Sequence, residues 1–249
     1  MSIYEVKTRV TYYDLDCKNT LKPSALLRMA NIAAEQNATD LGIGYTQMEP
    51  LSLAFVLQRF CIYSYIAPKY NQDVYVRTWP GEIIKGMFNR YGEMLDMNRV
   101  KMMEWISQWV LLDLRARKIL RPTELPVTLP VYGNLGVSAA GKKIEQLDKE
   151  AFNQLHHSFV YTVRYSDLDT NLHMNNAVYG NLIADALCPD ANSEIVWQNM
   201  LINFLAETRI GETINVSCIH AGDSYRVNGT VEGKPVFAAA VDAHKKNML

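Results

Sequence analysis

Two short segments of this chain are nearly identical, and this repeat limits the folds that the chain can adopt. Residues 10–16 read Val-Thr-Tyr-Tyr-Asp-Leu-Asp and residues 163–169 read Val-Arg-Tyr-Ser-Asp-Leu-Asp, so five of the seven positions agree. Each copy leads into a short polar turn and then into a helical pattern of apolar residues. A later pair of segments also corresponds, because residues 66–68 (Ile-Ala-Pro) and residues 205–207 (Leu-Ala-Glu) precede similar strand patterns. The chain is therefore predicted to contain two copies of one structural unit.

Each copy is predicted to be one helix followed by several strands. The first helix begins at Pro23, which is tolerated in a first helical turn, and ends before Gly42. The second helix begins at Asn175 or Asn176, either of which can cap it. Alternation of apolar and polar residues predicts the strands that follow. These strands cover residues 53–66, 74–79, 88–95, 102–114, 194–205, 213–220, 225–231 and 236–244.

The residues between the two halves are typical of a linker. They carry prolines, glycines and then a charged run at 142–150, which favour an irregular chain on the surface. We therefore predict an N-terminal domain of residues 1–126, a linker of residues 127–157 and a C-terminal domain of residues 158–249. The predicted fold class is α+β, in which each domain is an antiparallel sheet wrapped around a long helix. The alternative is that the seven-residue match arose by chance within one large domain.

Composition excludes several classes of function. The net charge of −1 and the pI of about 6.5 give no strong field that would draw the chain to nucleic acid or to an anionic membrane. The longest apolar stretch, residues 236–241, is far shorter than the roughly 20 residues that a membrane-spanning helix needs. The N-terminal residues lack the apolar core of a secretion signal. We therefore expect a soluble, cytoplasmic protein.

The sequence also lacks the common signatures of metal, nucleotide and serine-hydrolase sites. The four cysteines (Cys17, Cys61, Cys188 and Cys218) are too widely spaced for a disulfide framework or a zinc cluster. No Gly-x-Ser-x-Gly, His-Glu-x-x-His, Walker or Gly-x-Gly-x-x-Gly motif is present. We therefore predict that the protein needs no metal and no cofactor.

The two copies differ where side chains can do chemistry. Three positions of the second copy carry groups that the first copy lacks: Asn171 corresponds to Lys18, His173 to Thr20, and Glu207 to Pro68. A carboxylate or an imidazole can take a proton from water, and an amide or a helix N-terminus can stabilise an oxyanion. This set therefore fits a hydrolysis. The alternative is that the Asp- and Asn-rich turn merely caps a helix and that Glu207 is a solvated surface charge.

Residues 165–179 closely resemble the signature of the acyl-acyl-carrier-protein (acyl-ACP) thioesterases of plant plastids and many bacteria. They read Tyr-Ser-Asp-Leu-Asp-Thr-Asn-Leu-His-Met-Asn-Asn-Ala-Val-Tyr. The degenerate first copy and the linker length also fit that family, so the resemblance spans nearly the whole chain. It implies a tandem hot-dog fold, with a degenerate site and the acyl-chain tunnel in the N-terminal half. It also implies hydrolysis of a fatty acyl thioester on acyl carrier protein, with four catalytic positions: Asp169, Asn171, His173 and Glu207.

One departure from the family narrows the mechanism. Plant members carry a cysteine directly after the glutamate, whereas this chain has Thr208. A cysteine nucleophile is therefore hard to support, and attack by water with Glu207 as the leading base is the better hypothesis. Asn171 and His173 would position the water or the thioester carbonyl, and Asp169 would orient both. The roles of the two carboxylates could be exchanged.

Two alternative functions stay open at this point. One is a thioesterase acting on acyl-CoA, and the other is a non-catalytic acyl-binding protein, against which the intact set of four polar residues argues. Acyl carrier protein is acidic, so a basic docking face is expected. The densest basic cluster is Arg115, Arg117, Lys118 and Arg121, which is equally typical of a solvated strand end. Hot-dog units pair, and two halves can satisfy that pairing within one chain, so a homodimer also stays open.

Overall fold

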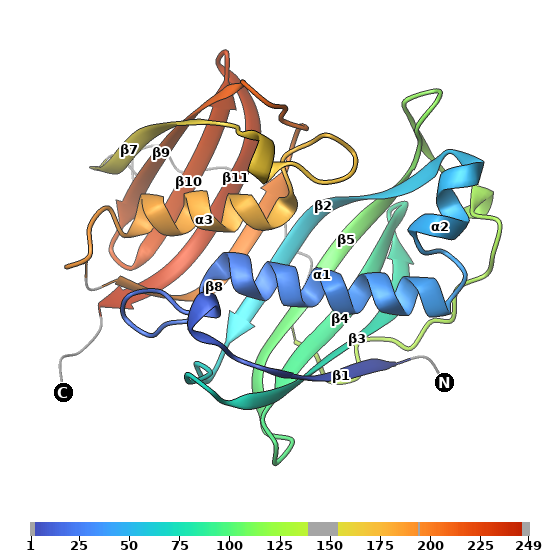
Figure 1. The fold of residues 1–249 in the computed structure, drawn as a ribbon, viewed down its shortest axis with the longest axis horizontal. Coiled ribbons are helices and arrows are strands. Elements are labelled where there is room, and N and C mark those ends of the chain that lie inside the picture. The colour runs from blue at the N-terminus through green and yellow to red at the C-terminus, as the bar shows by residue number, and fades with distance from the viewer. Residues whose placement is uncertain (1–2, 139–153, 194, 246–249) are drawn as a thin grey trace. The chain divides into compact units, whose positions relative to one another are not determined.

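The computed structural model describes residues 3–138, 154–193 and 195–245. The chain divides into two compact units, and Figure 1 shows that each unit contains an antiparallel sheet with a helix on one face. The N-terminal unit consists of residues 1–12 and 28–141, and the C-terminal unit of residues 13–27 and 142–249. The charged run at 142–150 and the first predicted residue of the strand at 194 lie outside the described residues.

The N-terminal unit has the strand order β1-β3-β4-β5-β2, with the short strand β6 added to β5. Its strands are β1 (Tyr4–Arg9), β2 (Leu53–Ser64), β3 (Asp73–Ile84), β4 (Met87–Leu95), β5 (Lys101–Asp113) and β6 (Lys118–Leu120). Its helices are α1 (Pro23–Asp40), whose first turn belongs to the C-terminal unit, and α2 (Tyr45–Met48). Short 3₁₀ turns are formed by η2 (Glu49–Leu51) and η3 (Pro122–Glu124), and a further one, η1 (Tyr12–Asp14), lies where the chain passes into the residues of the C-terminal unit.

The C-terminal unit repeats this arrangement with the strand order β7-β9-β10-β11-β8. Its strands are β7 (Gln154–Thr162), β8 (Ile195–Phe204), β9 (Thr213–Ala221), β10 (Ser224–Val231) and β11 (Lys234–Lys245). Its helix is α3 (Asn176–Leu187), preceded by the 3₁₀ turn η4 (Tyr165–Asp167). In each unit the first strand pairs with the third, and the second strand lies beside the fifth. The α+β fold class and the duplication predicted from the sequence are confirmed.

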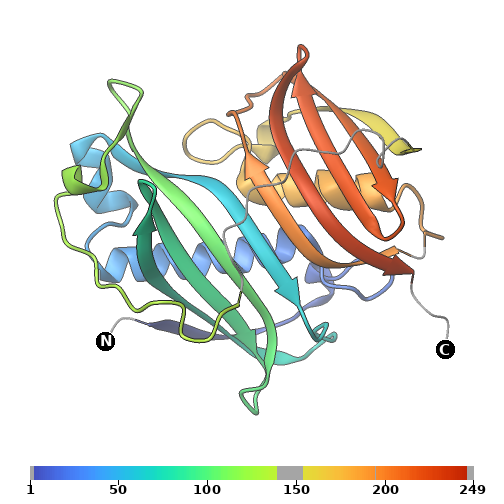
Figure 2. The same ribbon diagram turned by 180° about the vertical axis from the view of Figure 1, so that it is seen from behind.

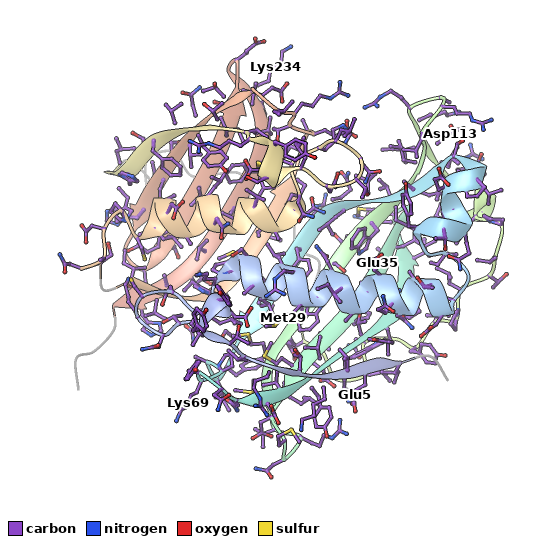
Figure 3. The ribbon with its side chains drawn as sticks, in the orientation of Figure 1. Glu5, Met29, Glu35, Lys69, Asp113 and Lys234 are labelled. Carbon is purple, nitrogen blue, oxygen red and sulfur yellow. The ribbon has the colours of Figure 1, made fainter. Side chains whose placement is uncertain are left out.

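Helix α1 places one apolar stripe against the sheet of the N-terminal unit. Figure 3 labels Met29, which is buried, and Glu35, which is exposed, on this helix. Asn37 lies within the buried stripe, and its Oδ1 accepts a hydrogen bond from Arg90 Nη1 at 2.8 Å. Burial lowers the pKa of Arg90 to about 10. A buried polar pair therefore holds the helix to the middle of β4, because neither group could lose its partner without a large cost in stability.

The same glycine–aromatic pair occurs in both sheets. Gly92 on β4 lies opposite Trp105 on β5, and Gly229 on β10 lies opposite Phe237 on β11. A Cβ atom at either glycine would collide with the ring of its partner. Trp105 and Phe237 are almost fully buried. In each unit, a large core ring therefore lies over a glycine of the neighbouring strand, where a side chain would leave it no room.

The segment that follows β6 crosses the N-terminal unit as a strap, which we define as residues 132–138. Tyr132 N–H donates to Pro80 O at 3.3 Å, and the indole N–H of Trp79 donates to Gly133 O at 2.9 Å. Further along, Lys101 Nζ donates to Gly136 O at 2.8 Å. Figure 2 shows the sheets from the side opposite the helices, where this segment passes. Direct hydrogen bonds thus join the strap to strands β3 and β5.

The end of the strap is anchored on a buried carboxylate. Glu104 is 1% exposed, and its Oε1 accepts from Ser138 N–H and from the Tyr65 hydroxyl, each at 2.8 Å. Lys101 Nζ lies 2.8 Å from the other oxygen. Burial and the bond to Glu104 raise the pKa of Tyr65 to about 12, so this hydroxyl stays a donor. The carboxylate is therefore satisfied by strap, strand and loop together.

The predicted elements agree with the structure apart from a few differences. Strands β1, β6 and β7 and the short helix α2 were not expected, although β1 alternates between half-buried and exposed residues. Strand β3 runs past Pro80 because a bulge between Pro80 and Ile83 accommodates the missing N–H. Strand β7 begins at Gln154, within the range given to the linker. Among the described residues, no helix is long and apolar enough to span a membrane.

Candidate active site

The turn that carries the predicted catalytic residues is held by Asp169. The Oδ1 atom of this residue accepts hydrogen bonds from the backbone N–H of Asn171 at 2.8 Å and of His173 at 3.4 Å. Its own N–H donates to His173 O at 2.9 Å. Leu172 takes a left-handed conformation with φ of 62° between them. Asp169 therefore stabilises the backbone conformation of the turn, and this conformation positions the side chains of Asn171 and His173.

The degenerate first copy contains the same turn. Asp16 Oδ1 accepts from the backbone N–H of Lys18 at 2.9 Å and of Thr20 at 2.8 Å. The Asp16 N–H donates to Thr20 O at 2.9 Å, and Asn19 has a φ of 59°. Lys18 and Thr20 stand where the second copy has Asn171 and His173, so the first copy keeps this aspartate without the two residues predicted to be catalytic. The hydrogen bonds of Asp16 therefore stabilise the backbone turn itself.

The imidazole of His173 meets the carboxylate of Glu207. The two side chains lie 3.0 Å apart between Nε2 and Oε2, and they are 19% and 33% exposed. The backbone joins their loops, because Met174 N–H donates to Thr208 O at 2.8 Å. The structure therefore brings together two predicted site residues that are distant in sequence, at a place that water can reach.

Thr208, directly after Glu207, is fully buried. Its Oγ1 lies 3.0 Å from the hydroxyl of Tyr179 on α3. Burial is the main cause that raises the pKa of Tyr179, and the nearby carboxylates of Asp169 and Glu207 act in the same direction. Tyr179 was not identified as a site residue from the sequence, because its contact with Thr208 joins distant segments. This bond fixes the start of α3 against the loop that carries Glu207.

Asn171 lies at the exposed tip of the turn, and the described residues provide no hydrogen-bond partner for its side-chain amide. The turn leads into α3, whose N-cap is Asn175, since its side chain accepts from Ala177 N–H at 2.9 Å. The N-terminus of this 12-residue helix carries a partial positive charge beside the His173 and Glu207 pair. This arrangement can polarise a carbonyl and stabilise an oxyanion next to a base.

No group of three or more His, Cys, Asp or Glu side chains in the described part of the chain could hold a metal ion. The four cysteines are free thiols, and burial raises the pKa of Cys218 to about 12. The chemistry that the site offers is therefore that of a carboxylate, an imidazole and amide groups.

Comparisons with known proteins relate both halves of the chain to thioesterases. Residues 2–125 match the family model of the acyl-ACP thioesterase N-terminal domain, and residues 150–234 match that of the acyl-ACP thioesterase C-terminal domain. The comparison with curated proteins gave no significant match.

Two solved structures share the fold over almost their whole length. An acyl-ACP thioesterase from Bacteroides thetaiotaomicron is 19% identical, with a TM-score of 0.79 and 98% of each chain covered. The 12:0-ACP thioesterase from Umbellularia californica is 17% identical, with a TM-score of 0.82, and the match covers 99% of this chain and 98% of that one. At these identities the structures establish the tandem hot-dog fold, while the two family models cover most of the sequence. This chain belongs to the acyl-ACP thioesterase family.

Proposed function

We propose that the protein hydrolyses acyl-ACP at the His173 and Glu207 pair, with water as the nucleophile. The family's reaction is the hydrolysis of the acyl-ACP thioester to a free fatty acid and acyl carrier protein. The observation that carries the assignment of the site is the 3.0 Å contact between His173 Nε2 and Glu207 Oε2 on an accessible face. The buried threonine after Glu207 supports water rather than a protein nucleophile.

In this mechanism Glu207 takes a proton from water, and the resulting hydroxide attacks the thioester carbonyl carbon. The contact with His173 holds the carboxylate in one orientation, and the one-third exposure of Glu207 leaves space for the water. The carbon–sulfur bond then breaks, and the proton on Glu207 passes to the departing sulfur. A thiol has a pKa of about 8.5, so its departure needs little help from an acid.

Asn171 and the N-terminus of α3 are assigned to the carbonyl oxygen. The exposed amide of Asn171 can donate to an oxygen that becomes negative, and the helix N-terminus favours the same charge. Each such donor is worth about 10²-fold or more in rate when it is aimed at the oxyanion. This assignment separates the residue that handles the proton from the groups that handle the developing charge.

Asp169 is assigned to the turn rather than to the proton transfer, because Asp16 makes the same bonds in the degenerate copy. Asp169→Asn keeps an oxygen that can accept both N–H groups, so this variant is expected to retain at least about a tenth of the turnover rate. Asp169→Ala removes the acceptor and is expected to lose about 10²-fold through misplaced side chains. Steady-state hydrolysis of acyl-ACP by both variants measures this difference. A loss in Asp169→Asn as large as in the alanine variant would make Asp169 the base.

The function is tested by release of free thiol from a panel of acyl-ACPs and the matching acyl-CoAs. We expect turnover on the carrier protein, with a higher kcat/KM than on the CoA esters of equal chain length. Preference for the CoA esters would keep the chemistry and change the physiological substrate. If neither carrier released thiol, the proposed function would be wrong, even though the chain has the fold of the family.

Three further parts of the proposal concern the surroundings of the reaction. We place the acyl chain in the N-terminal half, whose adaptable apolar side chains include Met29, Leu57, Met94 and Met103, all buried. We place the protein in the cytoplasm, on the composition of the chain. A homodimer is kept as an open expectation, to be settled by sedimentation of the purified protein.

A further inference from the structure

The C-terminal unit contains a pair of buried hydroxyl groups that the proposed mechanism does not use. Tyr179 on α3 is 3% exposed and Thr208 is 0% exposed, and their side-chain oxygens lie 3.0 Å apart. At this burial neither hydroxyl can contact a substrate that enters from solvent. Any effect of the pair on the reaction must therefore pass through a neighbouring residue.

The ring of Tyr179 is held in one direction by two other rings. The ring centroids of Phe204 on β8 and Phe237 on β11 lie 5.4 Å and 5.3 Å from that of Tyr179, at interplanar angles of 84° and 74°. Aromatic rings favour this edge-to-face arrangement, and both phenylalanines are buried. The sheet therefore fixes the place of the Tyr179 hydroxyl, so Thr208 is bound to a rigid point.

Thr208 connects this rigid point to the proposed base. It directly follows Glu207, and its carbonyl oxygen accepts the N–H of Met174, the residue after His173, at 2.8 Å. One backbone bond and one side-chain bond therefore hold Thr208. Because the side chain of Glu207 is 33% exposed, packing restrains it only in part. The position of its backbone then decides how often the carboxylate meets His173.

The degenerate copy lacks the tyrosine hydroxyl. The offset between the repeated segments at 10–16 and 163–169 places Leu26 where the second copy has Tyr179. Each is the fourth residue of its helix, and each is buried. An apolar side chain therefore satisfies the packing at this helical position. The hydroxyl occurs in the copy that also carries the predicted catalytic residues, so its use is better sought in the reaction than in the core.

We propose that Tyr179 and Thr208 are positioning residues, whose hydroxyl bond holds the backbone at Glu207 so that its carboxylate stays in contact with His173. This role rests on the proposed function, since Glu207 is the base of that reaction. The hydroxyl bond limits the motion of the base and leaves the binding of the acyl chain unchanged. Its loss should therefore lower kcat and not raise KM.

The experiment is steady-state thiol release from acyl-ACP by Tyr179→Phe, by Thr208→Val and by the double variant. We expect each of the three to lower kcat about tenfold, while KM changes by less than about twofold. Thr208→Ser keeps the hydroxyl and should retain most of the wild-type rate. Tyr225→Phe is the matched control, because it removes the hydroxyl of another buried tyrosine of the same unit, whose ring contacts His156 and His220 instead.

Thermal melting separates positioning from stability. Each single substitution leaves one buried hydroxyl without its partner and should lower the melting temperature, whereas the double variant removes both hydroxyls and should recover most of the loss. The turnover rate should not recover, because two apolar side chains cannot replace the hydrogen bond. If kcat rose again together with the melting temperature, the pair would be merely structural and the proposal would be wrong. Tyr179→Phe, which keeps the ring, carries the test if Thr208→Val does not fold.

A combination with Glu207→Gln tests the link to the base. In that background Tyr179→Phe is expected to change kcat by less than about twofold, because no carboxylate is left to position. A further tenfold loss would mean that Tyr179 acts on another group. Wild-type kcat in Tyr179→Phe and Thr208→Val, with a large loss in Glu207→Gln, would overturn the positioning role and leave the proposed function intact. Absence of thiol release by the wild type would overturn both.

Discussion

Glu207→Gln is expected to lower kcat for acyl-ACP hydrolysis by at least about 10²-fold, while KM changes little. The glutamine side chain has nearly the same size and can still meet His173 at the observed 3.0 Å position, but it cannot accept a proton from water. The measurement is steady-state thiol release over a range of acyl-ACP concentrations, with the folded state checked by thermal melting.

Glu212→Gln is the matched control, because it lies in the same loop and has the same change in charge. Glu212 Oε2 accepts the backbone N–H of Arg209 at 2.7 Å, and glutamine retains an oxygen for that bond. This control is expected to keep most of the activity. If Glu207→Gln turned over as fast as the control, Glu207 would not be the base, and His173 would have to activate the water without it.

Gly229→Ala is expected to destabilise the protein by about 2–3 kcal/mol, since the added methyl group would collide with the ring of Phe237 on the neighbouring strand. The ring is fully buried, so it has no open space into which it can move. The free energy of unfolding from denaturant titration, followed by circular dichroism, measures the loss.

A smaller side chain at Phe237 should recover part of that stability. Phe237→Leu alone costs stability through lost packing, but in Gly229→Ala it also removes the collision. The double variant is therefore expected to lose less than the two single losses together, by at least about 1 kcal/mol. Strict additivity would mean that the ring is not what keeps position 229 a glycine.

Much of the fold could be predicted from the sequence because its signals are local. The repeated Asp-Leu-Asp turn and the stop at Gly42 each act through the nearby backbone. Gly42 does have a positive φ, as such a helix stop requires. Strand β7 was missed because its sequence alternates poorly, and it is defined by its pairing with β9.

The site could be predicted as a set of residues but not as an arrangement. Sequence comparison of the two halves selected His173 and Glu207, yet only the tertiary structure gives their contact. The sequence could not assign different roles to the carboxylates of Asp169 and Glu207, because the hydrogen bonds of Asp169 to the backbone are visible only in the structure. The bond of Tyr179 to Thr208 was missed for the same reason, since it joins segments that are distant along the chain.

The strap has a consequence for dividing this chain into fragments. A fragment that ended at residue 126 would lose the Ser138 N–H, and the Glu104 carboxylate would have one donor fewer. The indole N–H of Trp79 would lose the Gly133 carbonyl in the same cut. Two polar groups would then need water where the intact chain has protein. A fragment that keeps these hydrogen bonds must extend to Ser138. The N-terminal unit therefore needs residues beyond the end of β6, its last strand.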